Sequence, residues 1–311
     1  MHTILGAGGS TANELTKELL KNKETIRLVS RRPVETQGQN ISWKKADLLS
    51  YPETLEAAKG SAVIYICNGV GYTNEDWKKQ WPVIMQNVIN AGKETGARII
   101  FLDNVYMYGR ATGPMTESTP YNPCSVKGGV RAQIATQFME EVKAGNIRGS
   151  IARAPGFYGT DSLQSSFDVT VLNKYSKHQR AMWLGDPEYT RNFGYMPDIG
   201  KALYLLGQHP ETDNEVWHTP TAPPLKGIEF IEMAASIYGV PAKYTRIYRW
   251  MLRTMGLFDK AAASQVEMYY IWEQHFDFVS AKFEKAFDIR PTSFEAGIRQ
   301  LSQSLYKAQI R

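Results

Sequence analysis

The sequence predicts an α/β fold in which a doubly wound parallel sheet is accompanied by a smaller, mostly helical C-terminal lobe. Two observations carry this prediction. A glycine-rich turn, Gly6 to Ala12, lies between an apolar strand pattern and a helical pattern at the start of the chain. Strand and helix patterns then alternate over roughly the first half of the chain, which is typical of parallel sheets.

The expected elements follow from apolar runs and their spacing. After a first strand that ends near residue 5, strands are expected at 26–33, 41–46, 62–67, 98–102 and 148–152, and helices at 51–58, about 80–95 and about 127–143. Helices dominate beyond residue 160. We therefore expect a nucleotide-binding domain over 1–160, to which 181–218 can add a strand and a helix, and a substrate lobe over 161–311.

The glycine turn predicts a Rossmann-type βαβ unit that binds a dinucleotide. Its spacing, Gly6-x-x-Gly9-x-x-Ala12, lets the backbone approach a diphosphate. The helix that follows offers free N–H groups and a positive dipole end, so Ser10 and Thr11 join the glycines as expected contacts. Packing of a tight turn would also explain the glycines, because such turns occur without ligands.

The end of the second strand favours NADP over NAD. An NAD site places a carboxylate there to accept from the ribose 2′-hydroxyl, whereas this chain has Ser30, Arg31 and Arg32. Guanidinium groups suit a 2′-phosphate, so NADPH is expected to bind better than NADH. The alternative is that both arginines are solvated charges at a strand end.

Composition limits the other classes of function. The net charge is +5, but its 36 basic residues are mixed with 31 acidic ones along the chain, so no nucleic-acid partner is expected. Cys67 and Cys124 are the only cysteines, which disfavours a disulfide framework or a metal site. We see no leader and no apolar run long enough to span a membrane, and expect a cytoplasmic protein without membrane contact.

Further motifs resemble the extended short-chain dehydrogenase/reductase family, the NAD-dependent epimerases and dehydratases, over nearly the whole length. The resemblance rests on the glycine turn, Asp47-Leu48, Asn68-Gly69, Val105 to Gly109, Arg153 to Gly159 and Arg191 to Asp198. It implies that the cofactor also contacts Asp47, Leu48, Asn68, Gly69, Asp103, Lys127, Pro155 and Phe157. Implied substrate contacts are Tyr106, Tyr108 and Arg191, the last for a phosphate or carboxylate unless it forms a structural ion pair.

The chain departs from this family at the catalytic residues. The family's Ser/Thr and Tyr-x-x-x-Lys positions fall on Asn104, Lys127 and Arg131. One interpretation keeps catalysis: Lys127 acts as general acid and base, Arg131 supplies a fixed charge, Asn104 donates its amide and Tyr106 offers a phenol. The other interpretation is an NADP-binding regulator or scaffold without hydride chemistry.

We therefore expect an NADP-dependent oxidoreductase or epimerase-type enzyme that acts on a small polar carbonyl or hydroxyl compound, sugar derivatives included. Its partner is a small-molecule substrate. The helices expected at about 80–95 and 127–143 resemble the pair through which members of the family dimerise, so a homodimer is a further expectation.

Overall fold

The computed structural model describes residues 1–36, 38–160 and 165–307. The chain forms two compact units. The first contains residues 1–107, 126–154 and 199–219, and the second contains 108–125, 155–198 and the residues from 220 onward. In this division 199–219 belongs to the first unit, within the segment 181–218 that was expected to add a strand and a helix, while 108–125 belongs to the second unit.

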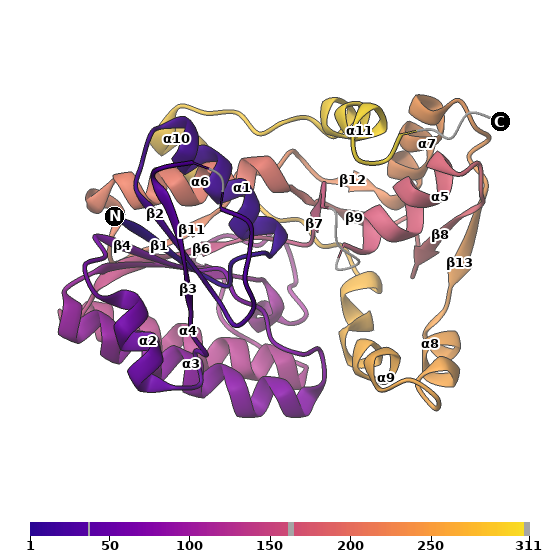
Figure 1. Ribbon diagram of the computed structural model, residues 1–311. Coiled ribbons are helices and arrows are strands. Elements are labelled where there is room, and N and C mark those ends of the chain that lie inside the picture. The colour runs from indigo at the N-terminus through magenta and orange to yellow at the C-terminus, as the bar shows by residue number, and fades with distance from the viewer. Residues whose placement is uncertain (37, 161–164, 308–311) are drawn as a thin grey trace. The chain divides into compact units, whose positions relative to one another are not determined.

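The first unit is built on a seven-stranded parallel sheet of order β11-β6-β5-β4-β1-β2-β3 (Figure 1). Its strands are β1 (His2–Leu5), β2 (Ile26–Ser30), β3 (Ile41–Lys45), β4 (Val63–Ile66), β5 (Arg98–Asp103), β6 (Arg148–Arg153) and β11 (Val216–His218). Every neighbouring pair is parallel. The strand order reverses between β1 and β4, so the predicted doubly wound sheet is confirmed and its ligand crevice is expected beyond these two strands.

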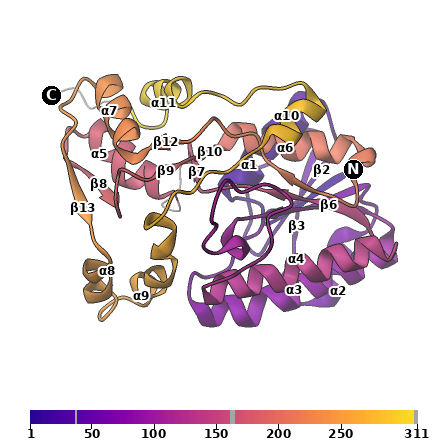
Figure 2. The same cartoon turned by 180° about the vertical axis from the view of Figure 1, so that it is seen from behind.

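Helices cover both faces of this sheet, as Figures 1 and 2 show from opposite sides. One face carries α1 (Ser10–Lys21) and α6 (Met196–Gln208), and the other carries α2 (Tyr51–Ala58), α3 (Asn74–Thr95) and α4 (Val126–Lys143). Short 3-10 turns lie at η1 (Tyr106–Tyr108) and η3 (Pro210–Thr212). Apolar strand residues such as Ile64 and Ile99 are fully buried between the two layers of helices.

Helix α3 begins earlier than the sequence pattern indicates. It starts at Asn74 because the Thr73 side chain accepts the backbone N–H of Asp76 and so caps the first turn. Pro82 lies inside the helix, where it removes one backbone hydrogen bond. The earlier start adds the buried Trp77 to this helix, which also carries the buried Trp81.

The second unit contains three two-stranded sheets and several helices. The sheets pair β7 (Phe157–Tyr158) with β10 (Gly194–Tyr195), β8 (Ala181–Leu184) with β13 (Tyr244–Ile247), and β9 (Thr190–Arg191) with β12 (Leu225–Lys226). The helices are η2 (Asp168–Leu172), α5 (Asn173–Ser176), α7 (Gly227–Tyr238), α8 (Arg249–Met255), α9 (Lys260–Val266), η4 (Glu267–Trp272), α10 (Ala281–Phe287) and α11 (Phe294–Gln303). Aromatic side chains dominate its core, among them Phe167, Trp183 and Phe230.

The described residues show neither a membrane-spanning helix nor a cluster of metal ligands. None of the helices in this part of the chain has the length and apolar character to cross a membrane. Within the same residues, no group of three or more His, Cys, Asp or Glu side chains is gathered as a metal ion would require.

Candidate active site

The glycine turn after β1 has a backbone that other residues rarely adopt. Gly6 and Gly8 have φ angles of +93° and +88°. A Cβ atom on Gly6 would lie 2.3 Å from the Cα atom of Asn68, so the turn touches the loop after β4 backbone to backbone. Gly9 precedes α1, and a Cβ there would meet nothing closer than the Gly6 carbonyl oxygen at 3.5 Å. The turn therefore leaves open backbone at the start of α1.

The surroundings of this turn fit a dinucleotide. Gly9 caps α1 without a side-chain hydrogen bond, and the first turn of the helix has no acidic residue that would compete with a phosphate. The buried Oδ1 atom of Asn68 has no hydrogen-bond partner among the described residues, and it could accept a hydroxyl or amide donor from a ligand.

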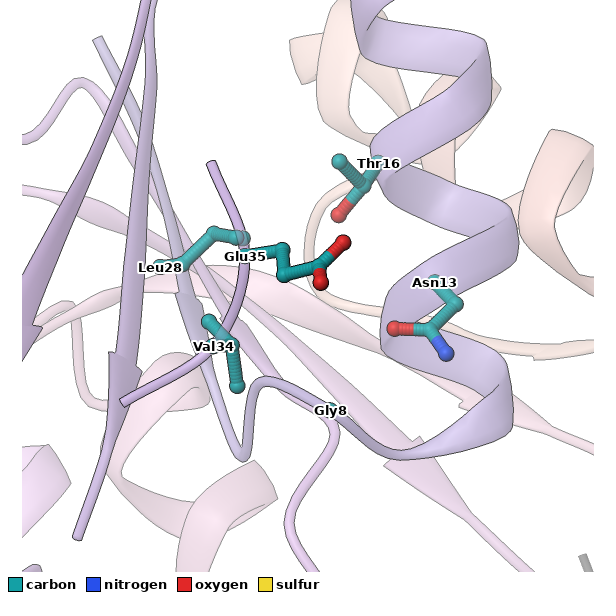
Figure 3. A pocket seen from close by; sticks show the side chains of 6 residues that line it. All are labelled: Gly8, Asn13, Thr16, Leu28, Val34 and Glu35. Carbon is teal, nitrogen blue, oxygen red and sulfur yellow. The ribbon is translucent and has the colours of Figure 1, made fainter. Parts of the chain in front are cut away.

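A pocket of about 380 Å³ lies between α1 and the segment after β2. It is lined by Gly8, Asn13, Thr16, Leu28, Val34 and Glu35. Figure 3 shows the Glu35 carboxylate extending toward Thr16 and Asn13 of α1. Because the adenosine ribose of a dinucleotide lies near the end of the second strand, Glu35 is a carboxylate that could accept from a 2′-hydroxyl.

Arg31 and Arg32 directly follow β2 and are exposed. In the described part of the chain, neither guanidinium has a hydrogen-bond or ion-pair partner. The end of β2 thus combines two arginines with the single carboxylate of Glu35, a residue that the sequence analysis did not single out.

The loop after β3 is tied to the helices on its side of the sheet. The carbonyl oxygen of Leu48 accepts a hydrogen bond of 2.8 Å from the buried side chain of Asn87 in α3. Asp47 accepts from the backbone N–H of Leu49, and its own N–H donates to Glu53. In the loop after β4, a Cβ on Gly69 would meet nothing within 4 Å, so this backbone is open.

A buried charge cluster lies at the end of β5. Asp103 Oδ2 accepts two hydrogen bonds from the guanidinium of Arg153, at 3.1 and 3.3 Å, and both side chains are buried. Asp103 Oδ1 accepts the backbone N–H of Asn104 and lies 3.5 Å from Arg131 Nη1. Burial raises the pKa of Asp103, while the two guanidiniums oppose that shift.

Arg131 of α4 reaches this cluster across the faces of aromatic rings. Its guanidinium carbon lies 4.0 Å from the ring centre of Trp81 and 5.1 Å from that of Trp77. Its contact with Asp103 has ion-pair distance but not hydrogen-bond alignment, because Nη1 and Nε have no hydrogen-bond partner among the described residues. Burial lowers the pKa of Arg131, and the nearby carboxylate of Asp103 opposes this.

Lys127 lies one helical turn before Arg131 and is fully buried. Its ammonium group donates to Oδ1 of Asn74 at 2.7 Å and lies 4.6 Å from the ring centre of Tyr72. The predicted catalytic lysine is therefore held between α4 and the start of α3.

Two phenols lie beside these cations. The hydroxyl oxygens of Tyr106 and Tyr72 are 3.5 Å apart, and the ring of Tyr106 stacks on Trp77. The Oδ1 atom of Asn104 accepts the backbone N–H of Tyr106 at 3.0 Å, and its Nδ2 group can donate in other contacts. The structure thus brings Lys127, Arg131, Asn104 and Tyr106 into one neighbourhood.

The other expected contacts belong to the second unit. Tyr108 donates to the carbonyl oxygen of Thr116, Pro155 directly follows the first unit, and Phe157 begins β7. Arg191 is buried, and its guanidinium carbon lies 4.1 Å from the ring centre of Trp272. It forms no ion pair within the described residues and its Nε has no hydrogen-bond partner there, so the alternative of a structural ion pair is not observed.

Sequence reasoning missed the aromatic residues around the cations. Tyr72 and Trp77 lie just before or in the first turn of α3, which the sequence pattern placed outside the helix, whereas Trp81 lies inside the expected range of about 80–95. A capping signal was present, since Thr73 is followed three residues later by Asp76. Reading that cap would have placed both tryptophans on one buried helical face.

The sheet, its reversal point and the open glycine turn define a protein of the dinucleotide-binding α/β class. The chain belongs to the NAD-dependent epimerase/dehydratase family, because the sequence model of that family matches residues 2–218. The resemblance inferred from the motifs is thereby confirmed. No curated protein sequence matches the chain.

Solved structures share the fold at low sequence identity. UDP-glucose 4-epimerase from Thermus thermophilus, in complex with NAD, is 13% identical with a TM-score of 0.78 and covers 99% of this chain and 100% of its own. UDP-glucuronic acid 4-epimerase from Bacillus cereus, also with NAD, is 17% identical with a TM-score of 0.75, covering 99% and 100%. A dTDP-glucose 4,6-dehydratase from Streptomyces venezuelae is 13% identical with a TM-score of 0.76, covering 98% and 97%.

Proposed function

We propose that this protein is an NADP-dependent oxidoreductase or epimerase-type enzyme for a small polar carbonyl or hydroxyl compound, with sugar derivatives in that class. The observation that carries the proposal is the open glycine turn at the reversal point of the sheet, with Gly6 packed against Asn68. Family membership and the NAD and sugar nucleotides named for the solved relatives support it.

The cofactor would be held along the carboxyl ends of β1, β2 and β4. Gly6, Gly9, Ser10 and Thr11 would face the diphosphate, and Asn68 would accept from a donor of the ligand. Arg31 and Arg32 would face a 2′-phosphate, because both are exposed and unengaged in the described part of the chain. When bound, the nicotinamide supplies the acceptor or donor of a hydride.

The remaining chemistry is a proton transfer, which we assign to Lys127 and Tyr106. Lys127 is a general acid and base one turn from the fixed charge of Arg131. Tyr106 is a second proton carrier, since its phenol hydroxyl lies 3.5 Å from that of Tyr72 and its ring stacks on Trp77, beside the Arg131 guanidinium. Asn104 would donate its amide to the substrate oxygen, as an oxyanion-stabilising group does.

A second candidate is an NADP-binding regulator without turnover. The complete burial of Lys127 and its bond to Asn74 favour this candidate, because a lysine held in this way also serves as a structural tie between α3 and α4. The two candidates differ in whether bound NADPH is consumed.

The test is Lys127→Met, with Lys143→Met as the matched control because Lys143 is an exposed residue of the same helix. For the carbonyl compound that the unmodified enzyme reduces, we expect turnover to fall at least about 100-fold in Lys127→Met, with NADPH affinity changed by less than about threefold. Equal loss of binding and turnover would remove Lys127 from the proton transfer. Tight NADPH binding without turnover of any substrate class by the unmodified protein would establish the regulator.

We also propose a cytoplasmic location and a homodimer formed through α3 and α4. Both helices lie on the same face of the sheet, and Val83 of α3 is 42% exposed although apolar. Val83→Glu should shift the mass measured by analytical ultracentrifugation from dimer to monomer. A monomeric mass for the unmodified protein would exclude the dimer.

A further inference from the structure

The buried guanidinium of Arg131 lacks hydrogen-bond acceptors for Nε and Nη1 among the described residues, and it shares its nearby carboxylate with a second arginine. The Oδ2 atom of Asp103 accepts two hydrogen bonds from Arg153, and its Oδ1 atom accepts the backbone N–H of Asn104. Arg131 therefore shares a carboxylate that is already engaged, at 3.5 Å and without a hydrogen bond. Two buried guanidiniums thus share the carboxylate of Asp103.

The unsatisfied groups around Arg131 are all donors. Among the described residues, Nε and Nη1 of Arg131 and the indole Nε1 atoms of Trp77 and Trp81 are buried without acceptors. These two indoles are the rings that the guanidinium faces, at 5.1 and 4.0 Å from their centres. A buried donor without an acceptor is unfavourable, so a cluster of four in native protein calls for a ligand rich in acceptors.

We infer that Arg131, Trp77 and Trp81 form a recognition site for an oxyanion, the carboxylate or phosphate of an anionic substrate. This inference rests on the proposed function and narrows its substrate to acids. A carboxylate or phosphate supplies several acceptor lone pairs and a negative charge, and guanidinium is the side chain best matched to both. Asn104 and Tyr106, which are only partly buried, lie beside these residues, and Tyr106 stacks on Trp77.

Calorimetric titration of the full-length protein tests this inference without requiring turnover. The probes are malonate, inorganic phosphate and malonamide, which is a neutral analogue of malonate, each with and without saturating NADPH. We expect malonate or phosphate to bind at least about tenfold more tightly than malonamide. We also expect binding to persist when NADPH is present, because the site serves the substrate.

Two variants assign the binding to these residues. Arg131→Met should weaken oxyanion binding at least about tenfold, and Arg131→Lys should restore part of it because the charge returns without the planar fork. Trp81→Phe keeps an aromatic ring under the guanidinium but removes one donor, so a loss of about threefold is expected. This variant decides the question even if Arg131→Met does not fold.

Three results would overturn the inference. They are absence of oxyanion binding in a protein that still binds NADPH, unchanged affinity in both Arg131→Met and Trp81→Phe, and competition between the oxyanion and NADPH, which would mean that a phosphate of the nucleotide uses the site. Failure to bind NADPH at all would instead count against the proposed function, so the two failures are distinguishable.

Discussion

The two ends of the candidate site in the first unit differ in what defines them. At the glycine turn the backbone defines the site: Gly6 has a positive φ and packs directly against Asn68. At the end of β5 side chains define it, with Asp103, Arg131 and Lys127 buried among aromatic rings. The difference teaches that the two ends tolerate change differently, since exchanging side chains at the end of β5 leaves the backbone in place, whereas a side chain at Gly6 displaces it.

The largest expected effect comes from a substitution in the glycine turn, where the backbone defines the site. Gly6→Ala would place a Cβ 2.3 Å from a backbone atom and would strain a φ of +93°. We expect the free energy of unfolding to fall by more than about 4 kcal/mol, measured by denaturant titration.

Gly9→Ala is the matched control. Its Cβ meets no atom closer than 3.5 Å and its φ of −80° suits any residue, so stability should change by less than about 1 kcal/mol. NADPH affinity should nevertheless fall at least about tenfold, because the Cβ fills the approach of the diphosphate. Equal stability losses in the two variants would show that the turn does not constrain the backbone as described.

The next largest effect comes from a substitution at the end of β5, where side chains define the site. Asp103→Asn leaves Arg153 and Arg131 buried without a carboxylate, and we expect a loss of about 3 to 5 kcal/mol in the free energy of unfolding. Asp213→Asn is the control, because its partner Arg98 keeps hydrogen bonds to the carbonyl oxygens of Gly207 and His209. A loss in Asp103→Asn no larger than in the control would contradict the charge cluster.

Asp168 is a buried carboxylate of the second unit that can be compared with Asp103. Asp168 is held by the backbone N–H groups of Gly159 and Thr160, at 2.9 and 2.8 Å, and burial raises its pKa from 3.8 to about 6. Between pH 4 and pH 6 the folded state therefore binds more protons than the unfolded state, and stability falls as the pH rises through this range.

The decrease amounts to at most about 3 kcal/mol, at 1.36 kcal/mol per pKa unit. Urea unfolding of the unmodified protein and of Asp168→Asn at pH 4, 5, 6 and 7 checks it, since other titrating groups cancel in the difference. A difference that stays constant, or that grows in favour of the unmodified protein with rising pH, would contradict the raised pKa.

The smallest expected effect concerns the choice of cofactor. Arg31→Asp should weaken NADPH binding about tenfold and NADH binding by less than about threefold, because only NADPH carries the 2′-phosphate. Glu35→Gln should act in the opposite direction and tighten NADPH binding, since it removes the one carboxylate that lines the pocket near β2. Equal changes for both nucleotides would refute the assignment of the 2′-phosphate to this place.

Sequence reasoning reached the parallel sheet because apolar strands and glycine turns are local patterns. Helix 51–58 begins and ends where the sequence pattern places it. The pairing of β11 with β6 is not a local pattern, because Val216 pairs with Ile151, which lies far from it in the sequence.

The candidate site was predicted only in part, for a physical reason. Counting from family motifs located Lys127 and Arg131, but neither the count nor the periodicity shows what a buried cation packs against. Trp81, Tyr72 and Glu35 are brought to the site by the fold, from segments whose sequence gives no sign of that proximity.

The central claim is that the first unit binds a dinucleotide at its glycine turn. Fluorescence titration of the purified protein with NADPH and with NADH tests it most directly, followed by a screen of the NADPH complex against aldehydes, ketones and keto sugars. We predict saturable binding of both nucleotides, tighter for NADPH, and oxidation of NADPH by one of these substrate classes. A folded protein that binds neither nucleotide would contradict the claim.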